Sequence, residues 1–304
     1  MIYTTDNLLT SIKNRAQLPD TTNPSSISAP ANLLSLATEE MRIKIVPLIL
    51  NADKEFYVSR LDVPVVANQE AYALPTRAAG NVLRSIRLVN GAYDAPFGAM
   101  DRDSLPMLPA STPLGYFFED NKICLFPAPA SAGLTIRMRY FQRPSRLEQT
   151  ANCAQVTAVN TVASQVTVSS VPASWQAGNT VDFIAQVVPY PTRAIDQAIV
   201  SISGTTITFS TLPSDLAVSD WIALSEYSPL PQMPEEFQPV LSQMVVCKCL
   251  EATGDRQGLQ VALADLKVNL ANAVTLITPR DESHPDKIVG TNWRRLTSVR
   301  GFLR

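Results

Sequence analysis

VTVSSVPASWQAGNTVDFI, residues 166–184, is followed by a related stretch, ITFSTLPSDLAVSDWIAL, residues 207–224. An offset of 41 residues lays Val166 and Pro172 on Ile207 and Pro213. Each copy alternates apolar and polar residues, passes a proline and a polar corner, and alternates again, which predicts two strands per copy. Because one small β unit cannot bury its own apolar face, the two copies should share a core. Residues 151–230 are therefore expected to form a duplicated β module, a small sandwich or barrel.

The preceding residues 56–150 also have a strand pattern. TIRMRYFQRP, residues 135–144, alternates apolar residues with arginines. Asn90-Gly91 and Asp120-Asn121 predict hairpin turns, because these residue types tolerate a positive φ. A second β-rich domain is therefore expected ahead of the duplicated module.

Both ends of the chain have helical periodicity. NLLSLATEEMRIKIVPLIL, residues 32–50, carries apolar residues at helical spacing, and its Pro47 should kink or restart the helix. Asp6 and Asn32 are the expected N-caps, and Gly254 the expected C-cap, of helices near the two ends. We predict an α+β fold in which a helical bundle from residues 1–55 and 231–279 encloses a long inserted β region. An extended arm is expected at 19–31, and another arm at 280–304.

The composition narrows the class of protein. Hydrophobic residues make up 46% of the 304 residues and charged residues only 17%, below the roughly 25% of ordinary soluble domains. A surface with so few charges suggests subunit interfaces. The pI of about 5.6 argues against a protein that coats nucleic acid. The first residues lack a signal-peptide pattern and no apolar run could span a bilayer, so we expect no membrane contact.

No constellation predicts catalysis, a cofactor or a metal. His284, the single histidine, lies outside any predicted core, and no glycine-rich phosphate loop is present. Asp101 and Asp103 are too few donors for a metal site. The four cysteines fit neither a disulfide framework nor a zinc spacing.

The last residues, TNWRRLTSVRGFLR (291–304), hold four arginines and no acid. Large apolar side chains recur among these arginines, and each costs about 1.5–3 kcal/mol to leave in water. Arginine pairs well with carboxylates. This pattern favours binding to an acidic groove on a partner protein over binding to DNA or a membrane.

Three stretches resemble the head-to-tail adaptor proteins of tailed bacteriophages, also called neck, connector or head-completion proteins. They are LLSLATEEMRIKIVPLILNADKEFYVSRLDV, EAYALPTRAAGNVLRSIRLV and YFFEDNKICLFPAPASAGLTIRMRYFQRPSRL. The most characteristic pieces are Tyr72-x-Leu74-Pro75 with Arg77-Ala78-x-Gly80, and Phe126-Pro127 ahead of Tyr140-x-x-Arg143-Pro144. The resemblance covers roughly residues 30–150 and the two late helices.

The resemblance implies a structural virion protein, not an enzyme, made in the host cytoplasm and placed in the neck. Such adaptors form a ring, commonly of about twelve copies, beneath the portal. The ring extends the DNA channel, through which DNA passes without sequence-specific binding, and offers a platform to tail, nozzle or tail-tube proteins. The resemblance further implies two sets of partner-binding residues. The portal-binding set is Trp293, Arg294, Arg295, Arg300 and Phe302, and the inter-subunit arm set is Pro19, Pro24 and Pro30.

Two other functions stay open from the sequence. The duplicated β module also suits a baseplate or fibre-attachment protein, which would oligomerise through its β region. A carbohydrate-binding module would use Trp175, Tyr190 and Trp221 as stacking residues, although an aromatic in an alternating strand is more often part of a core.

Overall fold

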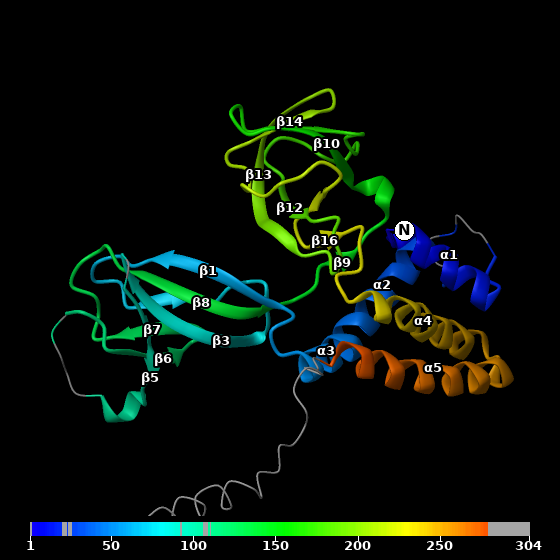
Figure 1. The fold of residues 1–304 in the computed structure, drawn as a ribbon, viewed down its shortest axis with the longest axis horizontal. Helices are drawn as coiled ribbons and strands as arrows, with labels where there is room; N and C mark the ends of the chain where they lie inside the picture. The colour runs from blue at the N-terminus through cyan, green and yellow to red at the C-terminus, as the bar shows by residue number, and fades with distance from the viewer. Residues whose placement is uncertain are drawn as a thin grey trace, which may run out of the picture.

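The chain folds into three parts, which the computed structural model describes for residues 2–278 except 20–22, 24–25, 92, 106–108 and 110. Figure 1 shows a helical part that contains both early and late segments, a part made of two sheets, and a β-barrel above the space between them. The α+β class predicted from the sequence is confirmed.

The helical part joins segments from both ends of the sequence. Its helices are α1 (Thr5–Ala16), α2 (Pro30–Glu40), the π-helical turn η1 (Met41–Ile45), α3 (Val46–Ala52), α4 (Gln238–Thr253) and α5 (Arg256–Ile277). The helix α4 packs against α1, α2 and α5. One apolar core therefore combines Leu8, Ile12 and Leu33 from the early helices with Phe237 and Leu241 from the late segment.

The predicted starts of two helices are wrong by a few residues. The N-cap of α1 is Thr4, whose Oγ1 accepts the N–H of Asn7 at 3.4 Å, and Asp6 lies in the first turn instead. The helix α2 begins at Pro30, because a proline at N1 needs no backbone N–H and already has a helical φ. Asn32 consequently lies inside the helix, where its Nδ2 donates to the carbonyl of Ser26 at 2.8 Å.

The other helix signals are confirmed. The regular helix gives way to the π-helical turn η1 and restarts as α3, which has Pro47 in its first turn. Gly254 ends α4 with a φ of 79°, in the left-handed region.

The second part is built from two four-stranded sheets with the orders β1-β8-β3-β4 and β2-β7-β6-β5. The first sheet contains β1 (Val58–Pro64), β8 (Thr135–Gln142), β3 (Ala78–Asn90) and β4 (Tyr93–Pro96). The second contains β2 (Ala71–Ala73), β7 (Lys122–Phe126), β6 (Gly115–Glu119) and β5 (Gly98–Ala99). Ile136 and Met138 of one sheet share a buried core with Ile123 and Leu125 of the other. Both predicted hairpins are present, with positive φ at Gly91 and at Asp120-Asn121.

The third part is a closed six-stranded barrel with the order β10-β11-β14-β13-β12-β15. Its strands are β10 (Ala154–Asn160), β11 (Gln165–Val168), β12 (Thr180–Ile184), β13 (Thr192–Ser203), β14 (Thr206–Phe209) and β15 (Trp221–Leu224). Val166 pairs with Ile207, and Asp182 pairs with Ala223. Both pairs join residues separated by the repeat offset, so an approximate two-fold axis passes between β11 and β14 and between β12 and β15.

The corners of the two repeats have the same hydrogen bonds. The N–H of Trp175 donates to the carbonyl of Pro172 at 3.0 Å, and the N–H of Leu216 donates to that of Pro213 at 3.3 Å.

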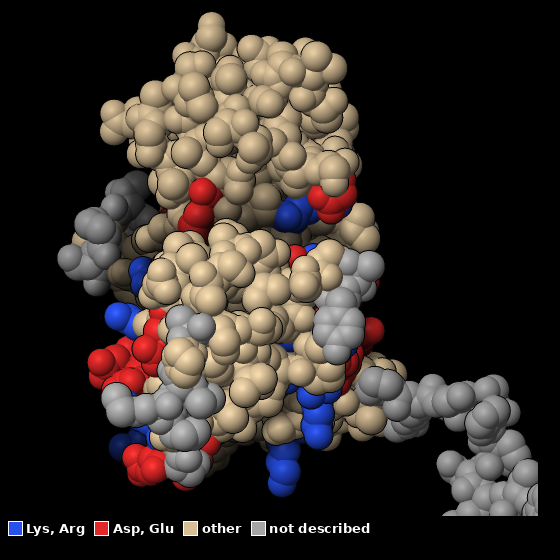
Figure 2. All heavy atoms as spheres, turned by 90° about the vertical axis from the view of Figure 1, so that its left-hand side faces the viewer, with Lys and Arg blue, Asp and Glu red and all other residues tan. Residues whose placement is uncertain are grey.

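Figure 2 shows that charged side chains gather over the sheet part and the base of the barrel, whereas the upper barrel surface on that face has none.

Two short segments cross between the parts. They pair in parallel as β9 (Arg146–Leu147) and β16 (Tyr227–Ser228). The first segment leads from the sheets into the barrel, and the second leads from the barrel into the late helices (Figure 1). The three parts meet around these crossings.

Candidate functional site

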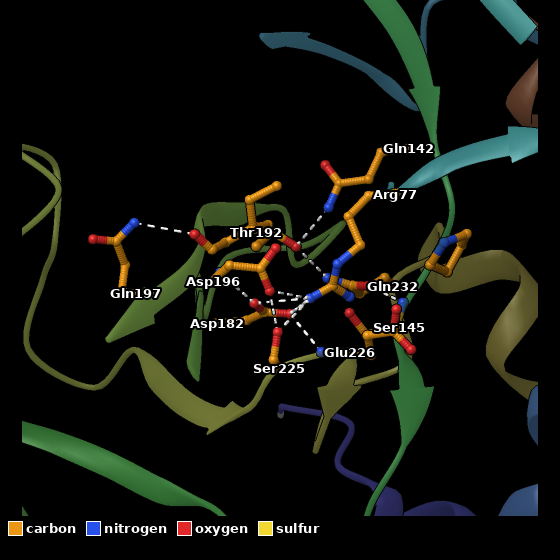
Figure 3. A network of polar contacts seen from close by, with 12 residues as sticks. Arg77, Gln142, Ser145, Asp182, Thr192, Asp196, Gln197, Ser225, Glu226 and Gln232 are labelled. Carbon is orange, nitrogen blue, oxygen red and sulfur yellow. Dashed lines mark hydrogen bonds and ion pairs between the residues drawn. The ribbon is translucent and has the colours of Figure 1, made fainter. Parts of the chain in front are cut away.

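The centre of the junction between the sheets and the barrel is the guanidinium of Arg77, in the loop between β2 and β3. Its Nη2 lies 2.8 Å from Oδ2 and 3.1 Å from Oδ1 of Asp182 on β12. The same nitrogen lies 3.2 Å from Asp196 Oδ1 and 3.0 Å from Ser225 Oγ (Figure 3). Arg77 is 6% exposed and Asp182 is fully buried. A single side chain of the sheet part is thus enclosed by acceptors of the barrel.

The Asp182 carboxylate is well satisfied despite its burial. Besides Arg77, it accepts the backbone N–H of Asp196 at 2.9 Å and that of Glu226 at 3.0 Å. Burial raises the pKa of this carboxyl, while the N–H of Asp196 and the charge of Arg77 act in the opposite direction. Buried ion pairs persist where hydrogen bonds satisfy the remaining lone pairs, as they do here.

Gln232 extends the junction toward the helices. Its Nε2 donates to Thr192 Oγ1 at 2.9 Å and to the carbonyl of Tyr190 at 3.3 Å, both in the barrel. Its Oε1 accepts the N–H of Ser145 at 2.8 Å. Thr192 also accepts a bond of 3.1 Å from Gln142 Nε2 of β8. One buried amide therefore joins the barrel to both crossing segments.

The helical part is attached by further polar contacts to the same crossing segments. Arg42 donates from Nε and Nη2 to the carbonyl of Pro144, at 3.0 and 2.6 Å. The hydroxyl of Tyr57 donates to the carbonyl of Gln232 at 2.8 Å, and burial raises the pKa of this phenol. The N–H of Leu147 donates to Thr38 Oγ1 of α2 at 3.0 Å. These contacts fix the relative position of all three parts.

The residues predicted to bind partners fall in three places. Trp293, Arg294, Arg295, Arg300, Phe302 and Pro24 lie outside the described residues. Pro19 is exposed after the end of α1, and Pro30 is the half-buried first residue of α2.

Sequence reasoning missed the junction, although two signals were present. Arg77 stands in the LPTRAAG stretch that carries the family resemblance, and no role was assigned to it there. Asp182 is a lone acid in the apolar strand TVDFI. A charge in such a strand needs a partner, but the sequence does not say which of the many arginines supplies it.

The carbohydrate-stacking prediction is wrong for two of its three residues. Trp175 is 6% exposed and Tyr190 is 1% exposed, because both belong to buried apolar clusters of the barrel part. Trp221 is half-buried against the cluster that contains Tyr190. A sugar ring needs an open aromatic face, which these side chains do not form together.

The described residues contain neither a cluster of metal-binding side chains nor a helix that could cross a membrane. No group of three or more His, Cys, Asp or Glu side chains there is arranged to hold a metal ion. Asp101 instead accepts the N–H of Asp103 at 3.3 Å, in a short 3₁₀ turn. No helix among these residues has both the length and the hydropathy needed to cross a bilayer.

Comparison with models of protein families gives a match. The family model described as SU10 adaptor protein matches residues 3–166, more than half of the chain. The match spans α1 to α3, both sheets, the first barrel strand β10 and the start of β11. No curated protein matches the sequence.

Proposed function

Because this chain belongs to the SU10 adaptor protein family, a family of phage head-to-tail adaptors, we propose that it forms a ring beneath the portal of the virion. The ring extends the DNA channel and offers the platform to which tail proteins attach. The family match over the early helices α1 to α3 and both sheets is the observation that carries this proposal.

The junction around Arg77 supports the role of a ring subunit. A subunit between head and tail must hold its parts at set positions while DNA and tail components act on it. The buried hydrogen bonds described above join the helices, sheets and barrel. A buried polar network in which every group has a partner makes such a connection rigid. In this proposal the helices form the bundle of the ring, and the barrel is an added module that faces outward or toward the tail.

The mild acidity of the chain supports passage of DNA without sequence-specific binding. The formal net charge of −2 does not attract the phosphate backbone, which dominates the affinity of most DNA-binding proteins. We expect the protein to show no sequence preference and only weak affinity for duplex DNA in a filter-binding measurement. Tight binding at physiological salt would contradict this part of the proposal.

The C-terminal residues 280–304 are proposed to bind the portal, with Trp293, Arg294, Arg295, Arg300 and Phe302 in contact with it. The segment around Pro19, Pro24 and Pro30 is proposed to reach a neighbouring copy. Apolar side chains between arginines support the first assignment, since such residues are common hot spots of protein interfaces.

The test uses purified portal rings and a protein lacking residues 287–304. We expect the truncated protein to keep its fold, measured by circular dichroism, and to lose portal binding, measured by co-sedimentation. Trp293→Ala should weaken binding, whereas its neighbour variant Asn292→Ala should bind like the wild type. Full affinity of the truncated protein would remove the tail from the proposal.

The alternative of a baseplate or fibre-attachment protein predicts a different contact. Such a protein would oligomerise through its barrel, whereas an adaptor would do so through its helices. Hydrogen exchange of the assembled protein separates the two, since only the contacting part gains protection.

A further inference from the structure

Helix α5 is far more apolar than its burial in one chain requires. Thirteen of its 22 residues are apolar and three are charged, yet only Ala262 and Ala273 are buried. The neighbouring α4 buries ten of its 16 residues. A helix that is apolar on more than one face is normally covered on more than one face. The uncovered side of α5 therefore suits a contact with another chain.

The apolar residues of α5 fall on two different faces. Leu266, Leu270 and Val274 pack against the core of the helical part. Val261, Ala264, Val268 and Ala271 follow one another at spacings of three and four residues, which places them on one stripe, here called the outer face of α5. Val261 is 62% and Val268 is 59% exposed. Figure 1 shows α5 at the lower edge of the helical part, with α4 above it.

The ring proposed above limits what can cover this face. Neighbours in a ring of more than two copies meet through two different surfaces, because a self-complementary contact closes as a dimer. The outer face of α5 therefore requires a second apolar surface elsewhere on the same chain, and not another α5.

A groove beside α2 is the candidate for this second surface. It has a volume of about 540 Å³ and lies between α2 and the crossing strand β9. Its lining combines the apolar residues Leu34, Ile43 and Leu147 with polar and charged ones. Of these three, Ile43 is 71% exposed, whereas Leu34 and Leu147 are buried. In Figure 1, α2 lies above α4 and α5 lies below it, so the groove and the outer face belong to different sides of the helical part.

Charges of both signs flank each surface: Lys267 with Asp265 on α5, and Glu39, Arg42 and Glu148 with Arg146 in the groove. Asp265 and Arg146 form one oppositely charged pair across the two surfaces. Both residues are exposed, and within the described part of the chain neither side chain makes a hydrogen bond or ion pair.

We propose that the outer face of α5 in one copy packs into the groove between α2 and β9 of the next copy. The proposal rests on the ring inferred above and names the two surfaces that close it. Asp265 of one copy then pairs with Arg146 of the next, at the edge of the contact.

The first test adds the same charge at two neighbouring positions of α5. Val268→Asp should weaken association between copies at least about tenfold, because a charge would be buried without a partner. Asn269→Asp adds a carboxylate about 100° around the helix and should assemble like the wild type. Copies per portal ring are counted by native mass spectrometry, and circular dichroism checks that both variants fold.

The second test exchanges the two charges. Arg146→Glu and Asp265→Lys should each slow ring closure, and the double variant should recover most of it, since the pair is restored with reversed sign. If both single variants close rings slowly and the double variant does so too, the proposed pairing of these two surfaces is wrong. If the Val268→Asp variant forms rings with the same number of copies as the wild type, the outer face of α5 is not part of the contact between copies.

These outcomes are separable from the proposed function. A wild-type protein that does not bind the portal contradicts the adaptor role itself. A wild-type protein that binds the portal as isolated copies contradicts the contact between α5 and the groove and leaves portal binding intact.

Discussion

The junction at Arg77 and the outer face of the first sheet are both built from arginine and aspartate, but they differ in burial. At the junction, Arg77 Nη2 and Asp182 Oδ2 lie 2.8 Å apart with almost no exposed surface. On the sheet, Arg137 lies 3.1 Å from Asp62 of β1 and 2.7 Å from Asp94 of β4, and the aspartates keep about a third of their side-chain surface in water. The nitrogen–oxygen distances are similar at the two places, so the two sets of ion pairs differ mainly in their exposure to water.

Because of this difference in burial, ion pairs of similar geometry contribute unequally to stability. Water screens the pairs on the sheet, and exposed pairs are worth only about 0–1 kcal/mol each. At the junction the charges have lost their water, so removal of one partner leaves the other without compensation. The junction therefore holds the barrel to the sheets, whereas the sheet pairs make only a small contribution to stability.

Arg77→Ala should have the largest effect on stability. The variant leaves Asp182 buried without a counter-charge, which costs about 3–5 kcal/mol in the free energy of unfolding. The loss should shrink as the pH is lowered, because burial raises the pKa of Asp182 and the protonated carboxyl needs no counter-charge. Urea unfolding at several pH values measures both effects.

Arg139→Ala is the matched control for that experiment. Arg139 is exposed on β8, and its loss should change stability by no more than about 0.5 kcal/mol. The double variant Arg77→Ala, Asp182→Asn should be more stable than Arg77→Ala alone, because the uncompensated charge is gone. If Arg77→Ala costs as little as Arg139→Ala, the junction does not hold the barrel.

Gln232→Ala should have an intermediate effect. It leaves the buried N–H of Ser145 without an acceptor and removes the bond to Thr192, at a cost of about 1–3 kcal/mol. Gln197→Ala removes a half-buried amide on β13 that donates to the carbonyl of Ile195 and accepts the hydroxyl of the exposed Thr211 at 2.9 Å. Since both partners stay near water, this variant should stay within about 0.5 kcal/mol of the wild type. Equal losses in the two variants, measured by thermal unfolding, would count against the burial argument.

Asp62→Asn should have the smallest effect, and the effect should depend on pH. The hydrogen bond from Arg60 lowers the pKa of Asp62 to about 2, and Arg137 acts in the same direction. Since the unfolded carboxyl has a pKa of about 3.9, the stabilisation is present above pH 4 and is lost as the pH falls toward 2.

The expected loss in Asp62→Asn is at most about 1 kcal/mol at pH 7, because water screens this exposed site. The difference from the wild type should shrink as the pH falls below 4 and be mostly lost near pH 2. Asp103→Asn, at an exposed turn, serves as the control. A difference between wild type and Asp62→Asn that stays constant from pH 7 to pH 2 would falsify the link to this carboxylate.

Local signals in the sequence predicted much of the fold. The turns at Gly91 and Asp120-Asn121 and the helix end at Gly254 follow from backbone preferences that a few residues carry. Prediction was less accurate for the helix starts at Thr4 and Pro30, because several neighbouring residues can cap a helix and tertiary contacts select one. The candidate site was missed, since Arg77 and Asp182 stand 105 residues apart and neither has a local partner.

The sequence by itself determined the α+β class, the hairpins, the repeat offset and the resemblance to phage adaptors. These features depend on periodicity, turn chemistry and residue order, which are properties of short stretches. Only the tertiary structure decided which arginine meets Asp182 and which face of α5 is left uncovered. Both depend on how distant segments pack, because burial arises from all three parts of the chain together and not from any one stretch.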